Sequence, residues 1–138
     1  MIDAPADVVW PILADVEGWP DWAYTFTRIT ILTDTQAGLG DVVTIKQPKL
    51  PAGTWIISEW VPGKSFAWVL RCPAMKATAN HVLTSMGNQC LFRQTMDFEG
   101  PLGWLSARRG RTLIRDYMAI EAQGLKRAAE RRLSDPAS

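Results

Sequence analysis

The chain has 138 residues, of which 47% are hydrophobic, and its formal net charge is +1. This length fits one globular domain that can bury a core without disulfides or a metal ion. No run of about 18 apolar residues occurs, and the first residues include acids where a secretory signal has bases. We therefore expect no transmembrane helix and no leader, but one cytoplasmic domain over residues 1–138 with a frayed tail at 134–138.

Two short helices are predicted near the N-terminus. Residues 5–14 have apolar residues at helical spacing, and Pro5 suits a first helical position, where its missing N–H has no consequence. Pro11 lies inside this segment, and we expect it either to kink the helix or to be tolerated in two turns near the N-terminus. Residues 15–22 predict a second short helix or a tight turn, because Gly18 interrupts the pattern.

The middle of the chain is predicted to be an antiparallel meander. β-Branched and aromatic residues alternate with polar ones, and Pro62-Gly63 and Gly87-Asn88 are tight-turn sequences. Short turns favour antiparallel neighbours. The expected strands are residues 24–32, 42–47, 54–61, 65–72, 75–86 and 89–99.

One long helix is predicted over residues 103–133. Gly110 is expected to mark a bend in it, and Gly124 to allow close approach to the sheet, because glycine weakens a helix interior. One face of this helix is mostly apolar. That face consists of Ile114, Tyr117, Met118, Glu121, Leu125 and Ala128.

The same helix is basic, with eight basic and four acidic residues from Gly103 onward. A basic helix is compatible with nucleic acid or with an anionic membrane surface. A solvated helix face explains it more simply, and no basic, aromatic strand motif for RNA accompanies it. We therefore expect no nucleic-acid partner and no integral membrane contact.

The order of elements predicts an α+β fold. Short helices, a run of strands and one long helix indicate a helix packed on one face of an antiparallel sheet. The sheet must curve around the helix so that each apolar face has a partner. Because a curved sheet and a helix do not meet along their whole length, we expect an internal apolar cavity between them.

Residue types exclude several kinds of site. The two cysteines, Cys72 and Cys90, are expected to be reduced thiols, with a disulfide or a metal pair as the alternative. Together with the single histidine, His81, they do not form a zinc signature. Neither a phosphate loop nor a nucleophile motif is present in the sequence. We expect no metal ion and no cofactor.

Several motifs carry a resemblance to a known superfamily. Pro5, Val9-Trp10, Asp15 and Trp19-Pro20-Asp21-Trp22 resemble the opening of START-like (SRPBCC, helix-grip) proteins, particularly the polyketide cyclase/dehydrase-like members. The segments 59–68 and 124–130 resemble the central hairpin and the usual ending of the last helix in that superfamily. Two further features agree with the resemblance. They are His81, at a position where a strand histidine is frequent, and Gly100-Pro101-Leu102, which leads into the last helix.

The resemblance implies a helix-grip fold, and two departures from it stand out. The superfamily normally opens with a full strand, of which only Met1-Ile2 remain here. We expect this strand to be either stunted or supplied upstream of this start, and the sheet edge to be exposed or to form a partner site. Many members place a carboxylate two residues before Phe98, where this chain has Met96. We therefore expect a more apolar pocket that is less suited to acid–base chemistry.

Alternation along residues 89–99 predicts which side chains enter the pocket. Phe92, Gln94, Met96 and Phe98 fall on the face toward the helix. Gln94 is expected to orient a ligand, because a buried amide requires partners. The alternative is that Gln94 bonds only to backbone or water.

His81 is the candidate catalytic residue and a candidate ligand contact. A neutral imidazole can act as a base or bond a ligand carbonyl, and Ala79 on the same face would leave room beside it. The alternative is a structurally bonded histidine.

The other candidate ligand contacts are mostly aromatic. Seven tryptophans are several-fold more than expected, and tryptophan suits pocket walls because it combines a large apolar area with one donor. Trp22 and Tyr24 lie near the pocket entrance by the resemblance. The remaining candidates are Trp55, Trp68, Tyr117 and Met118.

Three functions are compatible with these features. The leading hypothesis is that a small hydrophobic or aromatic molecule, of lipid or polyketide type, binds in the pocket. The second is a polyketide cyclase or dehydratase acting on a carbonyl compound, with His81 as base. The third is a non-catalytic interaction domain. The chain is expected to be a monomer or a homodimer.

Overall fold

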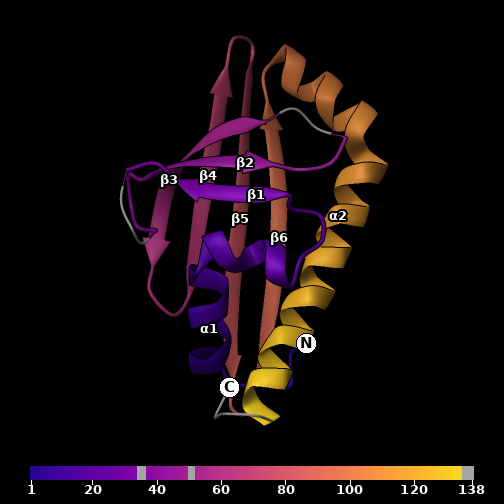
Figure 1. Cartoon of the computed structure of the whole chain (residues 1–138). Coiled ribbons are helices and arrows are strands. Elements are labelled where there is room, and N and C mark those ends of the chain that lie inside the picture. The colour runs from indigo at the N-terminus through magenta and orange to yellow at the C-terminus, as the bar shows by residue number, and fades with distance from the viewer. Residues whose placement is uncertain (34–36, 50–51, 135–138) are drawn as a thin grey trace.

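The computed structural model describes residues 1–33, 37–49 and 52–134. The chain forms helix α1 (Ala6–Ala14), the 3-10 helix η1 (Val16–Asp21), six strands and the long helix α2 (Pro101–Ser134), as Figure 1 shows. The strands are β1 (Arg28–Ile31), β2 (Val42–Lys46), β3 (Gly53–Val61), β4 (Ser65–Cys72), β5 (Met75–Met86) and β6 (Gln89–Glu99).

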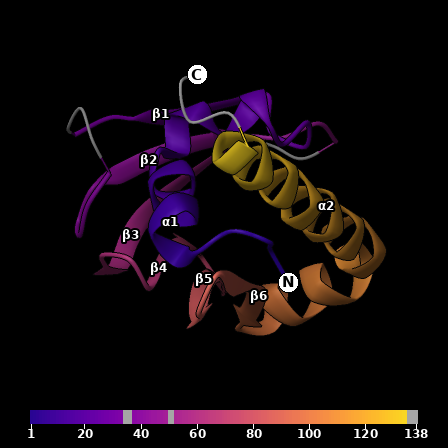
Figure 2. The same cartoon turned by 90° about the horizontal axis from the view of Figure 1, so that it is seen from below.

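The six strands form one antiparallel sheet in the order β1-β2-β3-β4-β5-β6. The meander and the α+β fold predicted from the sequence are confirmed. Figure 2 shows the sheet curling from β1 around to β6, with α2 across its open side. This arrangement is the helix-grip plan, in which the sheet wraps around one long helix.

The starts of two elements differ most from the prediction. β1 begins only at Arg28, because turns continue beyond η1, where the backbone N–H of Ala23 bonds Trp19 and that of Phe26 bonds Ala23. α2 begins at Pro101, before the predicted start, because proline fits a first helical position. α1 continues through Pro11 and ends at Ala14, as the predicted helix over residues 5–14 does.

Ile2 extends the sheet at the free edge of β6. Its backbone exchanges two hydrogen bonds with Cys90, of 2.8 and 3.1 Å, and forms one isolated antiparallel bridge. Ile2 is 2% exposed and Cys90 is fully buried. The short segment before α1 therefore covers part of the β6 edge.

An aromatic cluster joins the N-terminal helices to the sheet. The ring of Trp19 lies 5.2 Å from that of Trp68 and 6.0 Å from that of Phe66 on β4. Its indole Nε1 donates a 2.9 Å hydrogen bond to the carbonyl oxygen of Leu13, so the buried donor is satisfied. The cluster fills the part of the concave face that α1 and η1 cover.

Gly124 fixes how closely α2 approaches the N-terminal segment. A Cβ at this position would overlap the carbonyl oxygen of Trp22. The sequence correctly predicted a close approach at Gly124, but the prediction that the sheet would be the partner is wrong. The neighbour is the residue after η1, because that segment lies between this part of the helix and the sheet.

Replacing Gly124 with alanine is expected to lower the free energy of unfolding by about 2 kcal/mol, because helix and carbonyl must separate. Gly110→Ala is the matched control, since its Cβ would meet only Ile114 at 3.4 Å. That change is expected to raise stability by up to about 1 kcal/mol through helix propensity. Urea unfolding followed by circular dichroism measures both, and equal effects would contradict the close contact.

Candidate functional site

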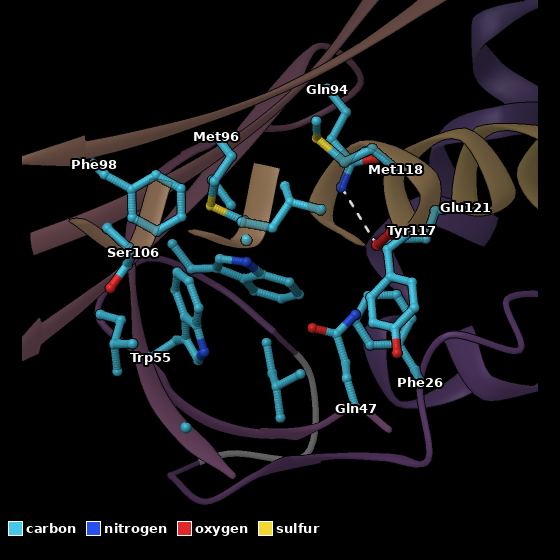
Figure 3. Close-up of a pocket in the computed structure, with 18 of the residues that line it drawn as sticks. Phe26, Gln47, Trp55, Gln94, Met96, Phe98, Ser106, Tyr117, Met118 and Glu121 are labelled. Atoms are coloured by element: carbon cyan, nitrogen blue, oxygen red, sulfur yellow. Dashed lines mark hydrogen bonds between the residues drawn. The ribbon is translucent and has the colours of Figure 1, made fainter. Parts of the chain in front are cut away.

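A cavity of about 270 Å³ lies between the concave face of the sheet and α2. Figure 3 shows its walls, where Trp55, Met96 and Phe98 surround the same space. These walls are mostly apolar, and the polar side chains among them are few. The polar lining residues are Gln47, His81, Gln94, Ser106, Tyr117 and Glu121.

The register of β5 and β6 explains why the space exists. Three short or compact residues of β5 face three long residues of β6, because directly opposite residues share a face of the sheet. The pairs are Ala77 with Phe98, Ala79 with Met96, and His81 with Gln94. The alanines leave room above β5 that side chains from the neighbouring strands and α2 do not fill.

His81 lies on the cavity wall and is 1% exposed. Its ring stacks on Phe66 with centroids 4.3 Å apart, and Nδ1 lies 3.4 Å from the Phe66 carbonyl oxygen. Nε2 has no hydrogen-bond partner among the described residues. Burial lowers the pKa of His81 to about 3, so the ring is neutral at neutral pH and is a weak base.

Gln94 and Glu121 connect β6 to α2 inside the cavity. The Gln94 Nε2 donates to Glu121 Oε1 at 3.5 Å, and Figure 3 shows the two side chains pointing toward one another. The Gln94 Oε1 is buried without a hydrogen-bond partner among the described residues. The protein therefore provides hydrogen-bond partners for only part of the Gln94 amide group.

Glu121 is the residue that the sequence prediction of the site missed. It is 5% exposed, and burial raises the pKa of its carboxyl to about 8, while the Gln94 bond opposes the rise. The signal was present in the sequence, since Glu121 stands on the otherwise apolar face of the last helix. An acid on such a face either carries a proton or requires a cation, and here it is protonated at neutral pH.

The ring of Tyr117 lines the cavity, but its hydroxyl already forms a hydrogen bond within the protein. The hydroxyl donates to the carbonyl oxygen of Pro48, in the connection between β2 and β3. This bond ties α2 to that connection. Tyr117 is therefore placed to hold the wall together, in addition to any contact with a ligand.

The structure brings most of the predicted ligand contacts to one cavity. Ala79 and Met118 line it together with the residues described above, as does the predicted wall tryptophan Trp68. The sequence did not indicate the contributions of Phe26, Ile45 and other lining residues, because alternation alone does not show which loops and strands reach the cavity.

Three predicted contacts lie off the cavity wall. Tyr24 is 77% exposed because it stands in a turn between η1 and β1. Trp22 packs against Trp19, at 5.5 Å between rings, and beneath α2 at Gly124. Phe92 lies on β6 between Gln94 and the bridged Cys90 and packs on the hydrophobic core.

Metal sites, disulfides and membrane-spanning helices were sought in the described residues as well. The described residues hold no group of three or more His, Cys, Asp and Glu side chains arranged for a metal ion. Cys72 is exposed, Cys90 is buried, and both are free thiols. None of the helices in the described ranges is long and apolar enough to span a membrane.

Comparison with known proteins identifies the family. The family described as polyketide cyclase / dehydrase and lipid transport matches residues 1–130. The chain belongs to this family. No curated protein sequence matches it. The START-like resemblance seen in the sequence is thus confirmed.

Several solved structures share the fold with this chain at low sequence identity. The Zhui aromatase/cyclase from Streptomyces sp. R1128 is 19% identical, with a TM-score of 0.71 over 99% of this chain and 93% of that chain. A START superfamily protein from Mycobacterium smegmatis is 16% identical, with a TM-score of 0.68 over 94% and 92% of the two chains. Norcoclaurine synthase from Thalictrum flavum, solved with dopamine and hydroxybenzaldehyde, is 12% identical, with a TM-score of 0.68 over 94% and 82%.

The two buried titratable groups predict how stability depends on pH. Between pH 3 and 6.5 the unfolded chain binds a proton on His81 that the folded chain excludes, so the free energy of unfolding rises with pH. Between pH 4.5 and 8 the folded chain keeps a proton on Glu121 that the unfolded chain releases, so the free energy of unfolding falls. Above pH 6.5 only the Glu121 effect remains, so the free energy of unfolding falls with pH.

Glu121→Gln is expected to abolish this fall, which amounts to about 2 kcal/mol between pH 6.5 and 8. Urea unfolding at both pH values measures it. Glu59→Gln is the control, because Glu59 is exposed on β3 and its replacement should leave the wild-type pH dependence unchanged. An unchanged pH dependence in Glu121→Gln would contradict the buried, protonated carboxyl.

Proposed function

We propose that the cavity binds a small, largely apolar molecule of lipid or polyketide type. The observation that carries this proposal is a preformed space of about 270 Å³ with apolar walls and a few polar groups, which is the usual composition of a small-molecule site. Burial of each 100 Å² of apolar ligand surface would contribute about 2.5 kcal/mol. The polar groups would set the orientation of the ligand.

The family supports this proposal. Its description joins polyketide cyclisation with lipid transport, and both activities involve ligands that are mostly apolar. Two structures with the same fold are named as an aromatase/cyclase and as norcoclaurine synthase, the latter solved with two small aromatic molecules. Aromatic compounds are therefore the first ligands to test.

A second candidate function, cyclisation or dehydration of a carbonyl compound, is favoured by Glu121. An acid whose pKa is raised to about 8 holds its proton at neutral pH and can deliver it to a hydroxyl oxygen that leaves as water or to a carbonyl oxygen that gains negative charge. His81 is less suited to the role of base, since burial disfavours its protonated form. Turnover of a bound ligand that Glu121→Gln abolishes, with binding retained, would support this candidate.

Ligand binding is expected to quench or shift tryptophan fluorescence, because Trp55 and Trp68 line the cavity. Titration with long-chain alcohols and with two- and three-ring aromatic compounds tests the proposal. Native mass spectrometry of freshly purified protein adds a search for a co-purified small molecule. The absence of any response across the panel, together with no bound molecule, would contradict the proposal.

Ala79→Leu is expected to weaken binding at least tenfold, because the added side chain occupies the space between Trp68 and Met96 on the neighbouring strands. Ala119→Leu is the matched control, which adds the same atoms to an exposed position on α2. A cooperative thermal unfolding transition is expected for both variants and would show that each is folded. Equal affinities for the two variants would place the ligand elsewhere.

A further inference from the structure

Two buried polar side chains, His81 and Glu121, and the half-buried Gln94 form a row across the cavity. His81 on β5 and Gln94 on β6 are directly opposite in the sheet, so their side chains share its concave face. From α2, Glu121 meets Gln94, with 3.5 Å between Nε2 and Oε1. The row runs from the sheet to the helix through a wall that is otherwise mostly apolar.

The protein provides hydrogen-bond partners for only some of the polar atoms in this row. Gln94 uses its amide nitrogen toward Glu121, while its Oε1 and the His81 Nε2 are buried without partners in the described part of the chain. A buried polar atom that lacks a hydrogen bond destabilises a protein by about 1–3 kcal/mol. Unpartnered atoms on a cavity wall therefore mark the end of the cavity at which polar ligand atoms are favoured.

Glu121 provides a donor at this end of the cavity. Its carboxyl is 5% exposed, and the cavity lining in the described ranges contains no lysine or arginine that would neutralise a carboxylate. Because burial raises its pKa to about 8, the carboxyl is protonated at neutral pH. Oε1 accepts from Gln94, so a proton on Oε2 remains available for an acceptor atom of a ligand.

We propose that Glu121, positioned by Gln94, selects uncharged aromatic ligands that carry a carbonyl oxygen over hydrocarbons of the same shape and over carboxylates. This inference rests on the proposed ligand-binding function and defines the class of ligand. A carbonyl oxygen accepts the Glu121 proton. A hydrocarbon leaves that donor unpaired, and a carboxylate is buried without a cation, which is strongly unfavourable.

Three probes of one shape separate these cases. 2-Acetylnaphthalene carries the carbonyl, 2-isopropenylnaphthalene replaces the oxygen with a methylene group, and 2-naphthoate carries the charge. Isothermal titration calorimetry at pH 6.5 measures each of them against the wild type and two variants. Glu121→Met removes the donor at similar volume, and Glu121→Gln retains a neutral donor, the amide N–H.

The ketone is expected to lose about five- to tenfold in affinity in Glu121→Met, which corresponds to one hydrogen bond. The hydrocarbon is expected to bind that variant at least as well as the wild type, and Glu121→Gln is expected to bind the ketone within about threefold of the wild type. The carboxylate is expected to bind the wild type at least about tenfold more weakly than the ketone.

The inference is overturned if Glu121→Met changes the affinities for the ketone and the hydrocarbon equally. It is also overturned if 2-naphthoate binds the wild type as tightly as the ketone does. In either case the binding function itself stands, since the probes still occupy the cavity. If none of the three probes binds the wild type while long-chain alcohols do, the inference fails and the broader proposal survives. If no ligand of any kind binds, both are wrong.

Discussion

The contact between Gly124 and the carbonyl group of Trp22 is the constraint on which the rest of the structure depends. It lets α2 lie directly on the segment after η1, and the neighbouring Leu125 and Ala129 are fully buried there. Farther toward its N-terminus the helix crosses a sheet that curves away from it, as Figure 2 shows. One end of α2 is thus packed tightly while the part from Ser106 to Glu121 borders a cavity.

The cavity combines an apolar wall with groups that are unfavourable to bury. A neutral histidine, a partly satisfied glutamine and a protonated glutamate all lower stability relative to apolar residues of similar size. Their pKa values move in opposite directions for the same reason, since burial disfavours the charged form of both His81 and Glu121. Retaining such residues at one end of an apolar space is physically consistent with recognition of a polar atom on an otherwise apolar ligand.

Family membership and function rest on different observations in this protein. The family match covers residues 1–130, whereas the structures compared above share the fold at 19% identity or less. Likeness at that level supports the architecture, and the same architecture supports binding, transport and several kinds of chemistry. The ligand must therefore be inferred from the side chains that line this particular cavity.

The sequence by itself determined the order of elements, the antiparallel meander and the inward face of β5 and β6, because periodicity and turn residues act locally. It also placed Gln94, Met96 and Phe98 on the face of the cavity. Only the tertiary structure decided that Phe92 packs into the core, that Tyr24 points into solvent and that Glu121 meets Gln94. These outcomes depend on how a curved sheet, α1 and α2 fill a shared volume, and that volume is set by contacts between residues far apart in the chain.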